Sequence, residues 1–314
     1  MRTGITSSML AARITLALAL FATVLAHGAE TFRVATYNLQ NYLEMAVGTR
    51  PAKTDAAKSK IRESIRATKA DVIALQEMGG TNALLELREA LRNDGCDFPY
   101  WEHVSAWDTN IHLAVLSKFP IVARRPHTND SFLLFNKRYF VKRGFAEVDV
   151  RVNGHYTFTL VTAHLKSKLS AWDADEEELR EEEAKLLREN LDTILKARPG
   201  VNLIVAGDLN DTRDSKAVRT VLAAGRKNAL VDARPAEQNG DDQRNSNPHY
   251  PAPQITWTHY FAKEDSYRRI DYILLSRGMA REWVSNETFI VKIPNWGLAS
   301  DHRPIVATFS AEER

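Results

Sequence analysis

The chain has 314 residues, of which 44% are hydrophobic and 26% charged, so it is long enough to bury one large core or two ordinary ones. It carries 42 lysines and arginines against 40 acids, and within residues 1–29 the charged side chains are Arg2 and Arg13. The chain beyond residue 29 is therefore close to neutral, which argues against nucleic-acid binding by bulk charge alone and leaves room for a local basic rim.

The first 29 residues have the pattern of a secretory signal. Arg2 and Arg13 precede an apolar run at residues 14–26, which has the length of a signal core and is too short to span a bilayer. We therefore expect a signal peptide at 1–29 and a single secreted or periplasmic domain at 30–314; a retained membrane anchor is the alternative. No later segment is apolar and long enough to cross a membrane. Cys96 is the only cysteine, so no intrachain disulfide is expected.

The first part of the chain is predicted to alternate strands with helices. Strands are expected at residues 32–39, 71–75 and 111–116, and helices at residues 54–68 and 82–91. The first strand runs directly into Gln40-Asn41, and the second into Gln76-Glu77. Polar residues at the end of an apolar strand are typical of a functional edge of a sheet.

A hairpin and an acidic helix are predicted next. Residues 145–152 and 156–162 flank Asn153-Gly154, which is a favoured pair for a tight turn. Residues 175–197 form a helix whose glutamates crowd its N-terminal half, where the helix dipole favours negative charge. We interpret the glutamates at 176–178 and 181–183 as a solvated helix face; a metal site is the alternative.

Residues 203–211 combine an apolar strand with a polar end. Four apolar residues run into Gly207, Asp208 and Asn210, which predicts a buried strand that stops at a functional edge. If the extended backbone continues through Asn210, the side chains of Asp208 and Asn210 project to one face and can hold a cation and a phosphoryl oxygen side by side. The alternative is a capped β-turn, because Gly, Asp and Asn are common turn residues.

The last part of the chain contains a long polar loop and two strands. The loop is expected at residues 233–255, and the strands at 269–275 and 305–309. Asp271 stands inside an apolar run, where a buried carboxylate needs a partner. Strands separated by two or three helices predict a mixed-sheet α/β protein.

These stretches, in this order, resemble the endonuclease/exonuclease/phosphatase superfamily, which includes the pancreatic-type DNases, AP endonucleases, inositol-polyphosphate 5-phosphatases and neutral sphingomyelinases. The motifs that carry the resemblance are TYNL at 36–39, LQE at 75–77, TAH at 162–164, GDLN at 207–210, RIDY at 269–272 and SDHRP at 300–304. The resemblance implies an α/β (α+β) fold, a four-layer sandwich of two packed mixed β-sheets flanked by helices, as in DNase I-like proteins. It places the active site at one end of the sandwich, where the strand ends meet.

The residue types at these positions fit phosphoester hydrolysis, which needs a cation on the phosphoryl group, an activated water and relief of charge on the leaving oxygen. Glu77 suits a Mg²⁺ ligand because that ion takes oxygen donors, and Asn38 would lie beside it; Mn²⁺ and Ca²⁺ are alternatives. His302 is the candidate base, since an imidazole with an ordinary pKa of about 6.5 exchanges a proton near neutrality. Asp271 would accept the other imidazole N–H and fix the tautomer.

The resemblance implies roles for the remaining site residues. Asp208 would contact the nucleophilic water or the leaving oxygen, and Asn210 would bind a phosphoryl oxygen. Asp301 would join the metal site, directly or through water. His164 would donate to a non-bridging oxygen or protonate the leaving group, and the division of labour among Asp208, Asp301 and His164 stays open at this point.

The sequence offers few contacts that would select a substrate. Lys166 and Lys168 either touch successive phosphates or are two solvated lysines in a loop. Arg143 belongs to a basic and aromatic stretch at 137–143, which either grips a nucleic-acid strand or guards a hairpin edge with charge.

We expect a secreted, Mg²⁺-dependent nuclease or general phosphodiesterase, with nucleic acid or another phosphodiester as substrate and no evident protein partner. The alternative is a phosphatase or a phospholipase C-type enzyme that acts on a phosphorylated lipid, inositol or small metabolite. A non-catalytic binding module on the same scaffold is the third hypothesis, and it is disfavoured because every expected catalytic residue type is present.

Overall fold

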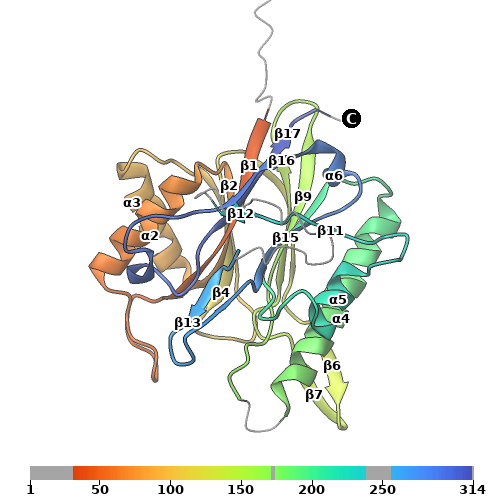
Figure 1. Cartoon of the computed structure of the whole chain (residues 1–314), viewed down its shortest axis with the longest axis horizontal. Helices are drawn as coiled ribbons and strands as arrows, with labels where there is room; N and C mark the ends of the chain where they lie inside the picture. Colours follow the sequence, from red (N-terminus) through yellow and green to blue (C-terminus); the bar gives the residue numbers. More distant parts are fainter. Residues whose placement is uncertain (1–30, 171–173, 238–255, 313–314) are drawn as a thin grey trace, which may run out of the picture.

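Two mixed β-sheets packed face to face form the centre of the computed structural model, which describes residues 31–170, 174–237 and 256–312. Helices cover the outer face of each sheet (Figure 1). This arrangement confirms the predicted four-layer α/β sandwich. The expected signal peptide at 1–29 and much of the loop expected at 233–255 lie outside the described residues.

The first sheet has seven strands in the order β12-β16-β17-β1-β2-β4-β3. Their bounds are β1 Thr31–Tyr42, β2 Val72–Met78, β3 Tyr100–Val104, β4 His112–Ser117, β12 Ala236–Glu237, β16 Trp283–Ile290 and β17 Ile305–Ser310. β1 pairs parallel with β2 and antiparallel with β17, so the first and last long strands of the sheet lie side by side. The helices α2 (Asp55–Thr68) and α3 (Thr81–Asn93) pack on the outer face of this sheet (Figure 1).

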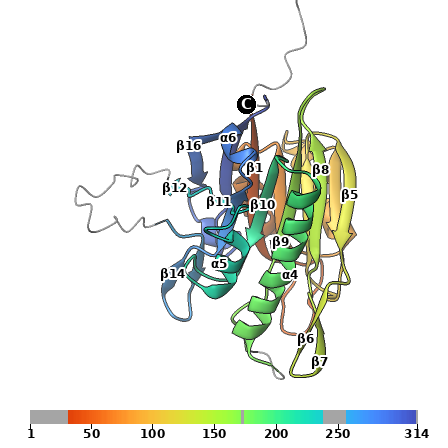
Figure 2. The same ribbon diagram turned by 90° about the vertical axis from the view of Figure 1, so that its right-hand side faces the viewer.

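The second sheet has six strands in the order β11-β15-β10-β9-β8-β5. Their bounds are β5 Ile121–His127, β8 Phe145–Arg151, β9 Thr157–His164, β10 Leu203–Asp208, β11 Val231–Asp232 and β15 Asp271–Leu275. β8 and β9 form the antiparallel hairpin predicted across Asn153-Gly154. The helices α4 (Glu176–Ala197) and α5 (Lys216–Leu222) cover the outer face, as Figure 2 shows for α4.

Strand periodicity explains the layers, because alternate side chains of β1 enter different cores. Phe32 and Val34 lie in the core between the two sheets, whereas Ala35 and Tyr37 lie in the core between the first sheet and its helices. Both faces of the strand are therefore buried. A polar link also crosses the inter-sheet core, where Gln76 Nε2 donates to Thr162 Oγ1 at 3.2 Å.

Short elements account for most of what the sequence did not predict. Two small hairpins, β6 (Ser131–Leu134) with β7 (Lys137–Phe140) and β13 (His259–Phe261) with β14 (Ser266–Arg268), stand apart from the main sheets. The strands β3, β5 and β16 and helix α5 were also unexpected; α6 (Met279–Glu282) and the 3-10 turn η1 (Trp296–Leu298) are single turns. No helix within the described ranges has both the length and the apolarity that a membrane span requires.

Two local interpretations from the sequence are wrong. The extended backbone does not continue through Asn210, because β10 ends at Asp208 and Asn210 has φ +55°. Glu183 is not part of a solvated helix face, since its side chain is buried and accepts a hydrogen bond from the backbone N–H of Lys166 at 2.6 Å. Burial raises the pKa of the Glu183 carboxyl, which the nearby Arg143 partly offsets.

Candidate active site

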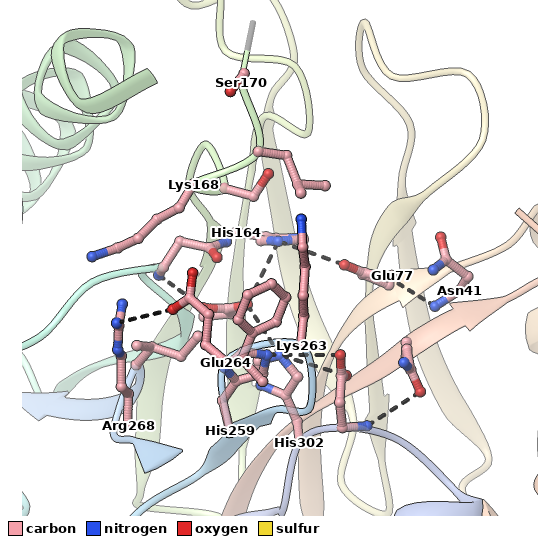
Figure 3. Close-up of a pocket in the computed structure, with 18 residues that line it drawn as sticks. Asn41, Glu77, His164, Lys168, Ser170, His259, Lys263, Glu264, Arg268 and His302 are labelled. Carbon is pink, nitrogen blue, oxygen red and sulfur yellow. Dashed lines mark hydrogen bonds and ion pairs between the residues drawn. The ribbon is translucent and has the colours of Figure 1, made fainter. Parts of the chain in front are cut away.

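The ends of strands from both sheets converge on one cavity of about 540 Å³ (Figure 3). Among the predicted site residues, those that line it are Glu77, His164, Lys168, Asp208, Asn210, Asp301 and His302. Asn38 and Asp271 stand behind this lining, each hydrogen-bonded to a residue in it. The eight residues that the sequence assigned to catalysis and metal binding thus meet in one place, although they are spread over positions 38–302.

Two backbone irregularities aim Glu77 into the cavity. The pairing of β1 with β2 shifts register between Asn38 and Tyr42, and the pairing of β2 with β4 shifts between Leu75 and Met78. Glu77 itself has φ +57°, and its Oε2 accepts the backbone N–H of Asn41 at 2.8 Å. Bulges of this kind are common next to active sites, where they redirect a side chain.

Gly207 and an Asx turn fix Asp208 at the end of β10. Gly207 has φ +151°, and a Cβ there would lie 2.0 Å from the carbonyl oxygen of Ala163, so the position accepts only glycine. Asp208 Oδ1 then accepts the backbone N–H of Asn210 at 2.8 Å, which turns the chain away from the sheet. The capped turn that the sequence left as an alternative is therefore the observed structure, and it still delivers both side chains to the site.

His302 and Asp271 form a buried pair. His302 Nδ1 lies 2.8 Å from Asp271 Oδ2, and the backbone N–H of His302 donates to Ser300 Oγ at 3.0 Å. Burial alone lowers the pKa of His302, but the carboxylates of Asp271, Asp208 and Asp301 outweigh it and raise that pKa to about 10. The remaining ring nitrogen, Nε2, lies 3.7 Å from Asp208 Oδ2 and faces the cavity side of the site.

Asp208 is the most crowded carboxyl of the site. Its Oδ2 accepts a hydrogen bond from Asn38 Nδ2 at 3.0 Å and lies 3.6 Å from His164 Nε2. Burial and the neighbouring Asp271 raise the pKa of Asp208 to about 7, against the attraction of His302. Burial and the cation of Arg143 hold the pKa of His164 well below its ordinary value. His164 is thus a neutral imidazole, whereas Asp208 can carry or release a proton near neutrality.

Asp301 is the more exposed carboxylate at the mouth of the cavity. One oxygen lies 3.9 Å from His302 Nε2 and the other 3.7 Å from His259 Nε2. Burial tends to raise the pKa of Asp301, but His259 and His302 hold it below the ordinary value, so this carboxyl stays ionised. His259 was not predicted as a site residue; its ring centroid lies 4.6 Å from that of His302.

The donor set around the cavity fits a hard divalent cation. Glu77 and Asp301 are carboxylates that line the same space, and the side-chain oxygen of Asn41 is buried there without a hydrogen-bond partner. Asp301 also groups with His259 and His302, since one ligand atom from each lies within 4.8 Å of the others. These carboxylate oxygens and the unpartnered amide oxygen are suitable ligands for Mg²⁺ or Mn²⁺.

Asn38 lies directly behind the residues that line the cavity. Its Nδ2 donates to Asp208 and its Oδ1 accepts the backbone N–H of Gln40 at 3.0 Å, so both ends of the amide are engaged. It therefore orients Asp208. Asn41 provides the unpartnered amide oxygen, three residues further along β1.

The three basic residues predicted to touch substrate are placed differently from one another. Lys168 lines the cavity and bonds Asp211 Oδ1 at 2.8 Å. The ammonium of Lys166 folds back onto the carbonyl oxygens of Ser167 and Leu169. Arg143 is buried behind the site, with its Nε 3.7 Å from Asp108 Oδ2. Lys168 alone of the three is a lining residue.

Other cations near the cavity gave no signal in the sequence. Lys263 and Arg268 reach the lining from the β13–β14 hairpin, which is too short to predict. Burial lowers the pKa of Lys53 to about 8, although the carboxylates of Asp301 and Glu77 favour its charged form. Lone cations in loops could not be assigned to a cleft without knowledge of how the loops pack.

A sequence model of the Endonuclease/Exonuclease/phosphatase family matches residues 35–302, which is most of the chain. The chain belongs to the endonuclease/exonuclease/phosphatase family. The family match spans the motifs used above as far as His302, and it makes the chain a hydrolase that acts on phosphoester bonds. A search of curated proteins found no significant match.

Solved structures of this family share the fold at low sequence identity. Sphingomyelinase C from Streptomyces griseocarneus is similar with a TM-score of 0.58 at 23% identity, covering 89% of this chain and 99% of that one. The catalytic domain of human nocturnin with bound sulfate has a TM-score of 0.60 at 17% identity, covering 90% and 95%. Truncated TDP2 from Caenorhabditis elegans has a TM-score of 0.56 at 16% identity, covering 90% and 98%. These likenesses establish the DNase I-like fold.

Proposed function

We propose that the chain is a secreted or periplasmic phosphodiesterase that depends on a divalent metal, with nucleic acid as the expected substrate class. The observation that carries the proposal is the buried His302–Asp271 pair, whose free imidazole nitrogen faces a cavity shared with Asp208, Glu77 and Asp301. A base, a group that titrates near neutrality and carboxylates for a cation are thus gathered around one space large enough for a phosphodiester.

The side chains divide the chemistry of hydrolysis. Asp271 holds the His302 ring so that Nε2 removes a proton from the attacking water. Asp208, which Asn38 orients, exchanges a proton with the water or the leaving oxygen, because its pKa of about 7 permits both states near neutrality. His164 donates from its neutral ring to a phosphoryl oxygen, since its depressed pKa disfavours the imidazolium.

Glu77 and Asp301 would hold the cation, with Asn41 beside them. When bound, Mg²⁺ or Mn²⁺ would neutralise charge on the phosphoryl group. The positive charge would also offset part of the carboxylate field that now raises the pKa of His302, which favours the imidazole form needed in a base.

A nucleic-acid substrate is supported by cations on the cavity rim, not by the charge of the whole chain. Lys168, Lys263 and Arg268 line the cavity, and the chain beyond residue 29 is close to neutral. Contacts from a few cations to phosphates would make KM rise steeply with salt, because each contact releases counterions.

Hydrolysis of a phospholipid headgroup is the second candidate. Leu169 lines the cavity with 71% of its surface exposed, so an apolar side chain stands beside the site. Sphingomyelinase C from Streptomyces griseocarneus also has a similar structure. A lipid substrate would show little loss of rate when salt is added.

A substrate panel separates these candidates. The purified chain would be assayed with Mg²⁺, with Mn²⁺ and with EDTA on plasmid, single-stranded DNA, RNA, sphingomyelin, inositol phosphates and a chromogenic diester. We expect EDTA-sensitive turnover of a diester and a salt-dependent KM on the nucleic acids. Turnover confined to sphingomyelin or monoesters would support the second candidate, and no turnover on any substrate with either metal would contradict both.

A further inference from the structure

The β6–β7 hairpin carries two of the most exposed apolar side chains of the described structure. Leu133 exposes 63% and Phe135 exposes 78% of its surface. The hairpin projects past the N-terminal end of α4 in both views (Figures 1 and 2). It lies at the same end of the molecule as β13, whose His259 lines the active-site cavity.

The turn at the hairpin tip is strained by an aromatic residue. Leu134 pairs with Lys137, so the loop has two residues, Phe135 with φ +49° and Asn136 with φ +62°. Positive φ at both positions is the type I′ geometry, which favours Asn, Asp and Gly. A bulky side chain in the left-handed region is an outlier that costs folding free energy. Packing does not repay this cost, because the Phe135 ring is exposed.

One face of the hairpin is fixed to the body of the protein. Phe132 is largely buried and stacks on Tyr139 with ring centroids 5.8 Å apart. At the base of the hairpin, Asn190 Nδ2 of α4 donates to Asp130 Oδ2 at 2.6 Å. The tip is therefore held in place while its apolar residues face outward.

The opposite face combines aromatic, aliphatic and basic side chains. Leu133 lies across from Arg138 in the hairpin, and both are exposed. Phe140, on the same face, stacks on Trp107 with ring centroids 3.8 Å apart, and Trp107 exposes 52% of its surface. We call the surface made by Trp107, Leu133, Phe135, Arg138 and Phe140 the hairpin surface. Lys137 lies on the other face of the hairpin, where its ammonium stands over the Tyr139 ring.

We propose that the hairpin surface binds an anionic phospholipid bilayer, with Phe135 and Leu133 inserted among the lipids. Exposed Phe135 and Leu133 at a projecting tip match a membrane interface, where apolar side chains enter the acyl boundary. Arg138 beside Leu133, and the exposed Lys137 at the end of the turn, would meet anionic headgroups. An indole such as that of Trp107 is also favoured at that boundary. A single-stranded nucleic acid fits less well, because bases stack on aromatic rings along a groove and an aliphatic Leu133 offers no such platform.

Membrane binding by the hairpin surface is independent of which phosphodiester the enzyme cleaves. Membrane binding would keep the active-site end of the molecule close to a lipid surface, whatever the substrate. Hydrolysis of a soluble chromogenic diester should accordingly be unchanged when the hairpin surface is altered, since none of its residues lines the cavity.

The central experiment is vesicle co-sedimentation of wild type and Phe135→Asn. Asn suits the type I′ turn, so this variant should fold at least as well as wild type while it lacks the aromatic ring. In EDTA, we expect wild type to bind vesicles of phosphatidylcholine with phosphatidylglycerol, and the variant to bind at least about tenfold more weakly. Leu85→Gln on α3, an exposed leucine far along the chain from the hairpin, is the matched control and should bind like wild type. All variants carry the same N-terminus, so differences in vesicle binding between them are due to the hairpin substitutions.

A second arm tests the charges and the competing partner. Lys137→Gln with Arg138→Gln should weaken binding to the anionic vesicles by about fivefold or more, and added salt should weaken wild type in the same way. Vesicles of phosphatidylcholine alone should bind little of any variant. The proposal is overturned if Phe135→Asn binds anionic vesicles as wild type does, if wild type does not bind them, or if the variant instead loses affinity for a single-stranded oligonucleotide.

Discussion

The imidazole of His302 and the carboxylate of Asp271 lie 2.8 Å apart, although the two residues come from different sheets of the sandwich. Asp271 is the first residue of β15 in the second sheet, and His302 precedes β17 in the first. Each side chain is almost entirely buried, so the pair exists because the two sheets pack together. A buried carboxylate at the start of an apolar strand finds its required partner in this way.

The His302–Asp271 pair should behave as one catalytic unit. We expect His302→Ala and Asp271→Asn each to lower kcat on a chromogenic diester by about 10²–10⁴-fold, the scale of one acid–base group. The double variant should lose little more than His302→Ala alone, because groups that act together are not additive. Asp265→Asn, an exposed carboxylate on the β13–β14 turn, should leave kcat unchanged. If the two kcat losses multiplied in the double variant, the assignment of His302 and Asp271 to one catalytic unit would be wrong.

Asp208 should matter for turnover and not for folding. Asp208→Ala is expected to lower kcat by at least about 10²-fold. Burial and the neighbouring Asp271 both disfavour the charged form of this carboxyl, so its removal should leave the thermal midpoint close to that of wild type. Near-wild-type turnover of a diester would show that the role assigned to Asp208 is wrong.

Glu77 should set the affinity for the divalent ion. Glu77→Gln is expected to raise the Mg²⁺ concentration for half-maximal activity by at least about tenfold. Even the loss of a residue that only supports a metal ligand lowers metal affinity on that scale. Glu287→Gln, a carboxylate on β16 with 45% of its side chain exposed, is the control. An unchanged metal requirement in Glu77→Gln would remove Glu77 from the metal site.

Substitution of Asn38 should lower kcat, whereas substitution of Asn41 should weaken Mg²⁺ affinity. Asn41→Ala removes the unpartnered amide oxygen and should weaken Mg²⁺ affinity by about tenfold, since ligands and their supports contribute on that scale. Asn38→Ala removes the hydrogen bond to Asp208 and should lower kcat with little change in metal requirement. Titration of activity with Mg²⁺ at saturating diester separates the two effects, and the opposite pattern would restore Asn38 as the residue beside the metal.

Gly207 should not tolerate a side chain. Gly207→Ala places a Cβ 2.0 Å from the carbonyl oxygen of Ala163 at a φ of +151°, so we expect a destabilisation of about 2–5 kcal/mol by urea unfolding from the combined overlap and backbone strain. Gly154→Ala is the matched control, because a Cβ at that residue would meet no heavy atom within 4 Å. Equal stability of the two variants would contradict the close approach of β9 and β10.

Acid should weaken an ion-pair cluster on the second sheet. Arg125 bonds Glu147 at 2.5 Å and Asp149 at 2.6 Å, and it helps to hold the pKa of both carboxyls below their ordinary values against burial. A carboxyl with a lowered folded-state pKa stabilises the fold above its unfolded pKa of about 4, and this contribution is lost as pH falls through the folded value. The destabilisation caused by Arg125→Gln should therefore shrink between neutral pH and about pH 3. Urea unfolding across that range measures it, with exposed Arg92→Gln as the control; a pH-independent loss would exclude the linkage.

The convergence of the proposed site residues on one cavity could be predicted from the sequence, because these residues belong to motifs near strand ends. Each lies in or next to an apolar strand that periodicity located; these residues are Asn38, Glu77, His164, Asp208, Asp271 and His302. The family resemblance then implied that these residues meet at one end of the sandwich. Asp271 was the clearest single signal, since an acid within a buried run demands a partner.

Contacts made by loops and short hairpins could not be predicted. His259 and Arg268 reach the cavity from two three-residue strands, which no periodic pattern reveals. The burial of Glu183 and Arg143 depends on how α4 packs against the loop at 165–170, a tertiary contact that overrides the polar appearance of the helix. The backbone at Asn210 could not be decided between an extended strand and a capped turn for a related reason, because both use the same residues.

The antiparallel pairing of β1 with β17 has a consequence for the order in which the active site is assembled during folding. Thr36 lies opposite Ile305, so β1 can complete its pairing only with a strand from the far end of the described residues. His302 comes just before that late strand and meets Asp271 only when it docks. The site between the sheets is therefore assembled only when β17 pairs with β1, so catalytic activity is expected to appear together with the docking of this strand.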